Sequence, residues 1–287
     1  MSSQLVSVII PNFNYGRYIS AAIDSALNQT YTNIEIIVVN NGSTDNSLEV
    51  IEKYGKKIKL INQPNLGQSG ARNSGLSLAQ GDFLAFLDAD DFWHPAKIEK
   101  QVSMIREETQ LVYCGITRVK SSGNQVISQE LPEYRGNCSE IFLTKPGVSI
   151  VLSGESTALF SKSLCDNVGL FDTELNSAAG WDYFRRCSKY TFFDFVPEPL
   201  SFYRIHKSNM SVSSQHNISD IRNAYKKLFS DSQWKVENDL QMQILIDLEY
   251  TFLKTHAKEL HLRDSLVSLN SIWKLSILRK KLIGNIP

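Results

Sequence analysis

Short apolar runs that end in polar turn residues alternate with helical patterns in the first third of the chain. Four of these runs are rich in β-branched or aromatic residues, as buried strands are: 5–10, 34–39, 58–61 and 83–87. Between them, apolar residues recur at the spacing of one helix face in 19–27, and the stretches 48–54 and 71–79 suit two further helices. This alternation predicts right-handed crossovers and a mainly parallel sheet of the α/β class.

Polar residues follow three of these runs. In an open parallel sheet, ligands bind beyond the carboxyl ends of the strands. Those ends carry Pro11-Asn12, Asn40-Asn41-Gly42 and Asp88-Ala89-Asp90. We therefore expect one ligand-binding crevice to which three strands contribute.

The pattern changes after residue 110. Three further extended stretches are predicted at 111–119, 125–128 and 192–203, and the region 217–283 is nearly free of Gly and Pro and predicts helices. The predicted organisation is an α/β domain and a helical extension: 1–215, with halves 1–110 and 111–215, followed by 216–287.

Composition excludes several classes of protein. Lys plus Arg and Asp plus Glu number 30 each, and this balance argues against a nucleic-acid binder. No run approaches the roughly 18 apolar residues of a membrane span, and no secretory signal is visible. The four cysteines are widely spaced without a Cys-x-x-Cys pair. We expect a cytoplasmic protein with reduced, buried thiols.

An acidic turn follows the fourth apolar run. Asp88, Asp90 and Asp91 would repel one another unless a cation or a hydrogen-bond donor neutralised them. Hard divalent cations bind carboxylate oxygens and bridge them to phosphates. The alternative is a solvated acidic turn that opens the next helix, with Asp91 or a neighbouring residue as its cap.

Three other interpretations of this turn fail. Haloacid-dehalogenase-like phosphatases carry Asp-x-Asp on the first strand rather than the fourth. An EF-hand loop starting at Asp88 would have Trp93 where Gly is required. A dinucleotide-binding loop needs Gly-x-Gly-x-x-Gly after the first strand, where this chain has residues 11–16, Pro-Asn-Phe-Asn-Tyr-Gly.

Several motifs, in this order and spacing, resemble those of the family-2 inverting glycosyltransferases, whose nucleotide-sugar-binding fold is called GT-A. The first set spans about residues 5–105 and comprises 6–14, 25–31, 39–45, 65–67 with 71–73, and 87–91. The likeness continues more loosely to about residue 211 through 169–172, 181–183 and 203–206.

The resemblance implies a GT-A fold with a Rossmann-like, mainly parallel sheet and a C-terminal helical extension. It implies metal-dependent transfer of a sugar, with inversion, from a nucleotide-diphosphate sugar, expected to be a UDP-sugar. The acceptor would be a hydroxyl on a growing polysaccharide, a glycolipid or a lipid-linked glycan of the cell envelope. The cofactor would be Mn²⁺ or Mg²⁺. The alternative is a nucleotide-sugar-binding module with little or no transfer activity, and a homo-oligomer is left open.

The resemblance also assigns donor-binding roles. Pro11 and Phe13 would flank the nucleobase, and Asn41 would face its edge. Arg72 would lie near the nucleotide, with a surface ion pair as its alternative role. Asp88 would meet the ribose or the sugar.

Four later residues receive roles in the same way. Asp90 would ligate the metal, and Arg204 and His206 would approach the diphosphate. Asp182 would be the general base. The alternatives left open are a helix-capping role for Asp182 and a structural role for His206.

The chain departs from the family pattern at two places. Asn40-Asn41 stands where the family usually has Asp-Asp, and an Asn oxygen accepts the uracil N–H without charge assistance. Ala179-Gly180 stands where Glu-Asp often precedes Trp-Asp, so Asp182 is the single carboxylate of that motif. Trp181 fits a core residue and an acceptor platform equally well.

The last predicted helix mixes apolar and basic residues. It combines Trp273, Leu275, Leu278, Leu282 and Ile283 with Lys274, Arg279, Lys280 and Lys281. Such a helix can lie on an anionic membrane surface, which would suit a lipid-linked acceptor. The competing interpretation is a helix packed on the catalytic domain.

Overall fold

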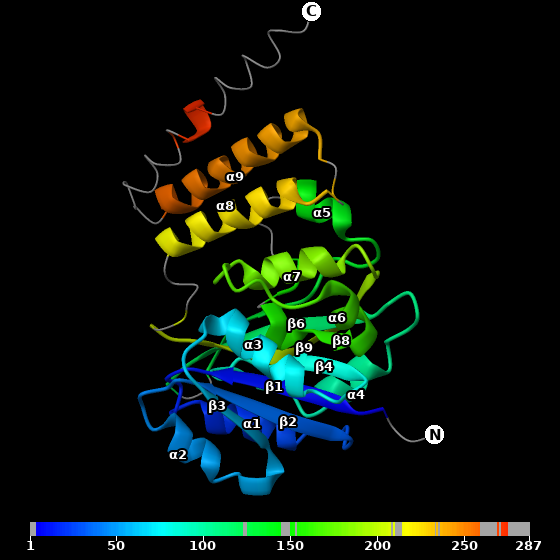
Figure 1. Ribbon diagram of the computed structural model, residues 1–287, viewed down its shortest axis with the longest axis vertical. Coiled ribbons are helices and arrows are strands. Elements are labelled where there is room, and N and C mark those ends of the chain that lie inside the picture. Colours follow the sequence, from blue (N-terminus) through cyan, green and yellow to red (C-terminus); the bar gives the residue numbers. More distant parts are fainter. Residues whose placement is uncertain are drawn as a thin grey trace, which may run out of the picture. The chain divides into compact units, whose positions relative to one another are not determined.

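A computed structural model describes residues 4–122, 125–144, 150–152, 154–207, 209, 214–232, 234, 236–258, 269 and 271–274. The chain forms two compact units. The first comprises 1–138 and 149–209, and the second comprises 139–148 and 210–287. Figure 1 traces both along the sequence.

A mixed β-sheet organises the first unit. Its order is β3-β2-β1-β4-β8-β6-β9-β5, with β7 beside β6. The strands are β1 Val6–Asn12, β2 Ile34–Asn41, β3 Lys59–Gln63, β4 Phe83–Phe86, β5 Phe92–Trp93, β6 Leu111–Lys120, β7 Val126–Glu130, β8 Leu159–Ser161 and β9 Phe193–Ile205. β1 pairs in parallel with β2 and β4, and β2 with β3, so the predicted parallel sheet is confirmed. β8 runs antiparallel to both β4 and β6 and makes the later half mixed.

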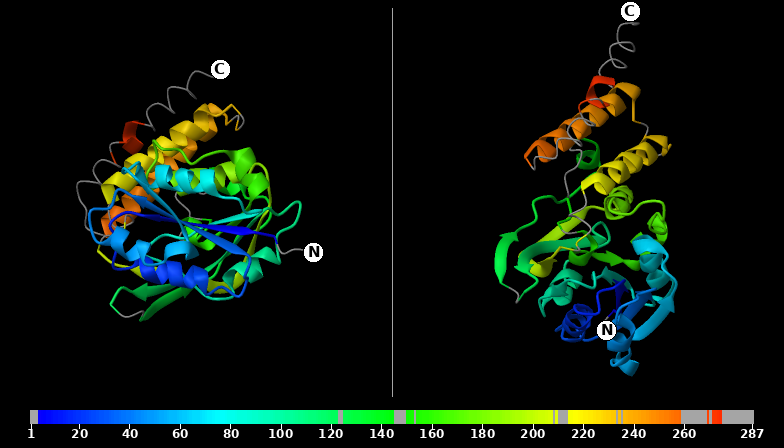
Figure 2. Two further views of the ribbon diagram at one scale, coloured as in Figure 1. Left: turned by 60° about the horizontal axis from the view of Figure 1, so that its bottom comes forward. Right: turned by 90° about the vertical axis from the view of Figure 1, so that its left-hand side faces the viewer.

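Helices cover both faces of the sheet, as the views in Figure 2 show. They are α1 Ile19–Leu27, α2 Ser47–Glu52, α3 Gly67–Leu78, α4 Lys97–Val102, α6 Lys162–Val168 and α7 Ala179–Cys187, with 3₁₀ turns η1 Gly55–Lys57 and η2 Gly154–Thr157. Val8 and Ile10 of β1 share a core with Ile23 of α1. Ile9 points to the opposite face, because side chains alternate along a strand. A Cβ on Gly75 of α3 would lie 2.3 Å from Ile9, so this glycine lets α3 pack closely on the sheet.

The second unit contains the helices α5 Ser139–Thr144, α8 Ser214–Ser230 and α9 Asn238–Lys258. The Tyr225 hydroxyl of α8 donates to the Phe142 carbonyl of α5 at 3.2 Å, and Arg222 of α8 forms an ion pair with Glu249 of α9. Within the described residues, no helix is long and apolar enough to span a bilayer. Residues 275–283, which carry most of the predicted membrane-surface helix, lie outside the described residues.

All four cysteines are buried and free, as expected.

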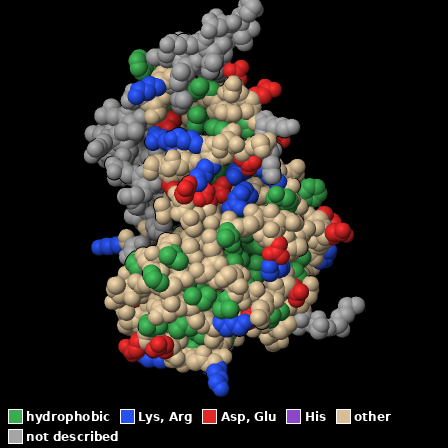
Figure 3. Space-filling view, viewed as in Figure 1, with side chains coloured by type: hydrophobic (Ala, Val, Ile, Leu, Met, Phe, Trp, Pro, Cys, Tyr) green, Lys and Arg blue, Asp and Glu red, His purple; other side chains and the backbone are tan. Residues whose placement is uncertain are grey.

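On the face shown in Figure 3, acidic and basic side chains lie interspersed, in keeping with their equal numbers in the sequence.

Candidate functional site

The loops after β1 and β2 are joined to each other. Asn14 adopts a left-handed conformation, with φ of 59°, which Asn tolerates better than most residues. Its Oδ1 accepts the Thr44 N–H at 2.7 Å, and its own N–H donates to Ser43 Oγ at 3.0 Å. Phe13, directly before it, leaves 43% of its surface exposed, whereas Pro11 is buried in β1. Phe13 is therefore available for stacking on a flat ring at the carboxyl end of the sheet.

Asn41, the last residue of β2, is held by the end of β3 and by the loop that leads from β3 to α3. Its Nδ2 donates to Asn65 Oδ1 and to the Gly67 carbonyl, both at 3.0 Å. Its Oδ1 accepts from Gln63 Nε2 at 2.9 Å and from the Leu66 N–H at 3.0 Å. An aspartate could not make the two donations, because an ionised carboxylate only accepts. This network gives a physical reason for Asn rather than Asp here, and contact of Asn41 with a nucleobase stays a prediction.

Arg72 connects the acidic turn to η2. Its Nη2 lies 3.0 Å from Oδ1 of Asp88, and its Nη1 lies 3.0 Å from Oε1 of Glu155. Arg72 is only 2% exposed, so the alternative of a surface ion pair is wrong. A buried guanidinium needs compensating charge, which the two carboxylates supply. The Asp88 side chain keeps 26% of its surface exposed and can still reach a ligand.

Asp90 lies at the centre of the polar cluster. Its Oδ2 is 2.9 Å from Nε2 of His206 and 3.5 Å from Nδ2 of Asn209. Burial, followed by the charge of Asp88, raises the Asp90 pKa, while the His206 contact opposes the rise. The neighbouring Asp91 is fully buried and accepts the Arg204 N–H at 3.1 Å, and burial raises its pKa well above the usual range. Burial and the closeness of the three carboxylates therefore both disfavour the ionised form of Asp90 and Asp91.

Arg204 and His206 come from the end of β9 and reach this turn. Arg204 Nε donates to the Asp90 carbonyl at 2.9 Å, and its guanidinium lies over the Tyr18 and Phe92 rings. The His206 ring stacks on Tyr18 with centroids 5.0 Å apart. The structure thus brings Asp90, Arg204 and His206 together, and their contacts with a diphosphate stay predictions.

A divalent cation fits this turn. Within the described part of the chain, no three His, Cys, Asp or Glu side chains form a complete metal cage. Mg²⁺-like ions are commonly held by only one or two carboxylates together with substrate phosphates. Burial, and after it the charge of Asp88, raise the pKa of Asp90, and a bound cation would favour the ionised carboxylate that both of them disfavour. Asp90 therefore has the chemistry to hold such an ion with a diphosphate, and the metal stays a proposal.

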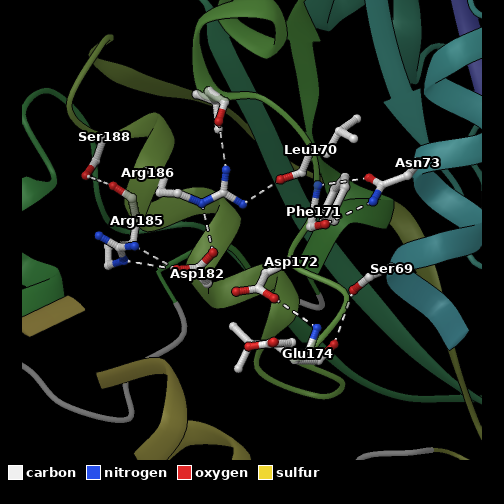
Figure 4. A network of polar contacts seen from close by, with 12 residues as sticks. Ser69, Asn73, Leu170, Phe171, Asp172, Glu174, Asp182, Arg185, Arg186 and Ser188 are labelled. Atoms are coloured by element: carbon white, nitrogen blue, oxygen red, sulfur yellow. Dashed lines mark hydrogen bonds and ion pairs between the residues drawn. The ribbon is translucent and has the colours of Figure 1, made fainter. Parts of the chain in front are cut away.

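Asp182 lies in the first turn of α7, which begins three residues earlier, so the helix-capping alternative is wrong. Its Oδ1 accepts from Nη2 of Arg185 at 2.7 Å, and its Oδ2 accepts from Nε of Arg186 at 2.8 Å. Figure 4 shows the carboxylate between these two arginines. Both carboxylate oxygens are therefore already hydrogen-bonded to guanidinium groups. The role of Asp182 as general base stays a prediction. Trp181 beside it is half-buried.

Comparison with known proteins decides the family. The model of glycosyl transferase family 2 matches residues 7–169. An uncharacterized glycosyltransferase of Rickettsia prowazekii is 30% identical over 258 residues, which cover 88% of this chain and 80% of that protein. The chain belongs to glycosyl transferase family 2.

Two further comparisons give a relative with a named activity and a solved structure with a similar fold. The Escherichia coli enzyme WfgD, named as a UDP-Glc:α-D-GlcNAc-diphosphoundecaprenol β-1,3-glucosyltransferase, is 46% identical over 107 residues, 37% of this chain and 42% of that protein. The crystal structure of S. aureus TarS residues 1–349 with UDP-GlcNAc superposes with a TM-score of 0.67 at 20% identity, covering 94% of this chain and 81% of that one. The likeness to TarS supports the GT-A-like fold of this family-2 chain.

Three site residues of this family-2 chain were not predicted from the sequence. Asn209 holds Asp90 and donates to the Arg204 carbonyl at 3.0 Å, and Tyr18 supports His206. Glu155 reaches Arg72 from a short 3₁₀ turn. Asn209 lies three residues after His206 and so adjoins a motif of the resemblance, whereas Tyr18 and Glu155 lie outside those motifs and reach the site through contacts between distant segments.

Proposed function

We propose that this family-2 enzyme transfers a sugar, with inversion, from a UDP-sugar to a hydroxyl of a lipid-linked or other glycan acceptor. The observation that carries the proposal is the contact of Asp90 with His206, which joins the acidic turn after β4 to the end of β9. The names of WfgD and of the TarS complex support a UDP-sugar, and that of WfgD supports a lipid-diphosphate acceptor.

The chain's residues divide the work of binding. The exposed ring of Phe13 would stack on the base, and Asp88 would accept from hydroxyls of the ribose or the sugar. Asp90 would hold Mn²⁺ or Mg²⁺, and a divalent ion there supplies charge neutralisation for the departing diphosphate. His206 and Asn209 would keep the Asp90 carboxylate in place. Arg204 would hold the backbone of the turn through the Asp90 carbonyl.

Inversion requires a proton acceptor on the side opposite the leaving diphosphate. The resemblance points to Asp182, which would have to release Arg185 or Arg186 before taking a proton. The competing function, a nucleotide-sugar-binding module, is favoured by this engagement and by Ala179-Gly180 in place of the family's carboxylates.

A direct assay tests the proposal. The purified chain is incubated with UDP-glucose or UDP-GlcNAc, Mn²⁺, and a GlcNAc-diphospholipid acceptor, and UDP release and the glycolipid product are measured. We expect acceptor-dependent UDP release that EDTA abolishes. Donor binding by calorimetry without UDP release from any donor and acceptor pair would instead identify a binding module.

A further inference from the structure

Gly180 and Glu155 occupy neighbouring space. A Cβ built on Gly180 would lie 2.6 Å from Oε1 of Glu155 and 3.0 Å from its Cδ and Oε2. Real Cβ atoms do not approach other atoms this closely, so a side chain at 180 and the Glu155 carboxylate exclude each other. The Glu155 carboxylate thus lies against position 180, the position at which the family pattern often has the Asp of Glu-Asp.

Glu155 also belongs to the donor site. One guanidinium, that of Arg72, lies 3.0 Å from both the Glu155 and the Asp88 carboxylates. η2 is fastened to the acidic turn, because the Asp88 N–H donates to Ser156 Oγ at 3.0 Å and Trp93 Nε1 donates to the Ser156 carbonyl at 2.7 Å. Glu155 therefore lies beside the residue expected to meet the donor sugar.

The surroundings leave Glu155 able to take a proton. It is 5% exposed, next to a partly exposed Gly180. Although Arg72 Nη1 is close, no aligned hydrogen bond from the described residues reaches Oε1. Burial is the largest cause that raises the Glu155 pKa; Arg72 lowers it and Asp88 raises it. A base works best with a pKa near the operating pH. Both oxygens of Asp182 already accept hydrogen bonds from arginines, whereas Oε1 of Glu155 accepts none from the described residues.

We infer that Glu155 is the general base of the transfer reaction, in the space that Gly180 leaves open. The acceptor O–H proton passes to a Glu155 oxygen as the hydroxyl oxygen forms its bond to the anomeric carbon. The bond from that carbon to the diphosphate breaks, and its electron pair leaves with the UDP. Glu155 then returns the proton to water. This inference rests on the proposed function.

A purely structural Glu155 would only balance the charge of Arg72. The base role and the ion-pair role predict different results when the carboxylate is moved from position 155 to position 180. An aspartate at 180, with the Glu155 side chain removed, would return a carboxylate to the same space from α7. If Glu155 is the base, the double variant should regain activity and the acid limb of its pH–rate profile. If Glu155 serves only to pair with Arg72, the new carboxylate at 180 should restore neither.

The experiment compares Glu155→Gln, Gly180→Ala, Glu155→Ala and the double variant Glu155→Ala/Gly180→Asp with wild type in the UDP-release assay. Glu49→Gln on α2, whose side chain is 72% exposed, is the matched control. Circular dichroism and thermal unfolding report folding, and calorimetry reports UDP binding.

We expect kcat of Glu155→Gln to fall by roughly 10²–10⁴-fold, as for loss of a positioned base. Gly180→Ala should also lower kcat, since its Cβ displaces the Glu155 carboxylate. UDP affinity should change little. The double variant should regain at least about tenfold over Glu155→Ala and restore the acid limb, which Glu155→Gln lacks.

Two results would overturn the inference while leaving the proposed function intact. One is wild-type kcat in folded Glu155→Gln. The other is a double variant that folds and binds UDP but is no more active than Glu155→Ala. A wild-type chain that transfers no sugar would overturn both.

Discussion

Nε2 of His206 lies 2.9 Å from Oδ2 of Asp90, across 116 positions of sequence. The contact links the end of β9 to the turn after β4, the two segments that carry most of the polar site. The contact orients the Asp90 carboxylate. Burial and the charge of Asp88 raise the Asp90 pKa, and the His206 contact opposes that rise. We therefore expect ionised Asp90 to lower the stability of the metal-free protein and to strengthen the binding of a cation.

Asp90→Asn should therefore stabilise the metal-free protein at pH 7 while weakening UDP binding in Mn²⁺. The raised pKa means that ionised Asp90 opposes folding, so the gain should shrink as pH falls through that pKa and the wild-type carboxylate becomes protonated. Each kcal/mol gained corresponds to roughly 2–4 °C for domains of about 150–250 residues. Thermal unfolding from pH 4 to 8 and calorimetry check both parts. A lower melting temperature at pH 7 would contradict the idea.

Asp182→Asn should act mainly on stability. Arg185 is only 3% exposed and would lose its ion pair with Asp182, and breaking a buried ion pair typically costs about 3–5 kcal/mol. With Glu155 as base, the folded variant should keep kcat within about tenfold of wild type. Urea unfolding and single-turnover transfer measure the two effects, with the exposed pair residue Asp166→Asn as control. Intact folding and UDP binding with kcat lost would return the base role to Asp182.

Asn41→Asp should destabilise the loop rather than improve uracil binding. The carboxylate would face Asn65 Oδ1 and the Gly67 carbonyl, which now accept from Nδ2 at 3.0 Å. Leaving buried acceptors unpaired costs about 1–3 kcal/mol each, and we expect a lower melting temperature and weaker UDP binding. Asn28→Asp at the exposed end of α1 serves as control. Tighter UDP binding by Asn41→Asp would show that Asn41 faces the base instead.

Lys97→Met should stabilise the protein most at low pH. Burial lowers the Lys97 pKa to about 8, and the ammonium donates to Gln101 Oε1 at 2.6 Å above the Trp93 ring. Because the unfolded lysine titrates near 10.4, the advantage of Met should be full below pH 8 and shrink between about pH 8 and 10.4. Chemical denaturation at pH 6.5 and 9.5 tests this. An advantage that grew with pH would be inconsistent with a buried, charge-destabilised lysine.

The strands and helices of the parallel half were predictable because each is a local pattern. β1, β2 and β4 are short runs of buried apolar residues, and α1 carries its buried apolar residues at helical spacing. β8 has three residues and β5 two, too few for any periodicity, and their pairing with β4 and β9 places them. The segment 139–148 joins the helical unit without any pattern that indicates it.

The sequence by itself determined the α/β class, the family resemblance and the acidic turn, because these depend on residues close together along the chain. Tertiary structure alone decided the partners of the buried charges. Arg72 binds Asp88 and Glu155, and Asn41 is enclosed by the loop between β3 and α3, whereas the pairs of Asp182 with Arg185 and Arg186 are local to α7. Such pairings depend on which distant segments share a low-dielectric interior, where every charge requires a partner. No local spacing encodes the space that Gly180 leaves for Glu155.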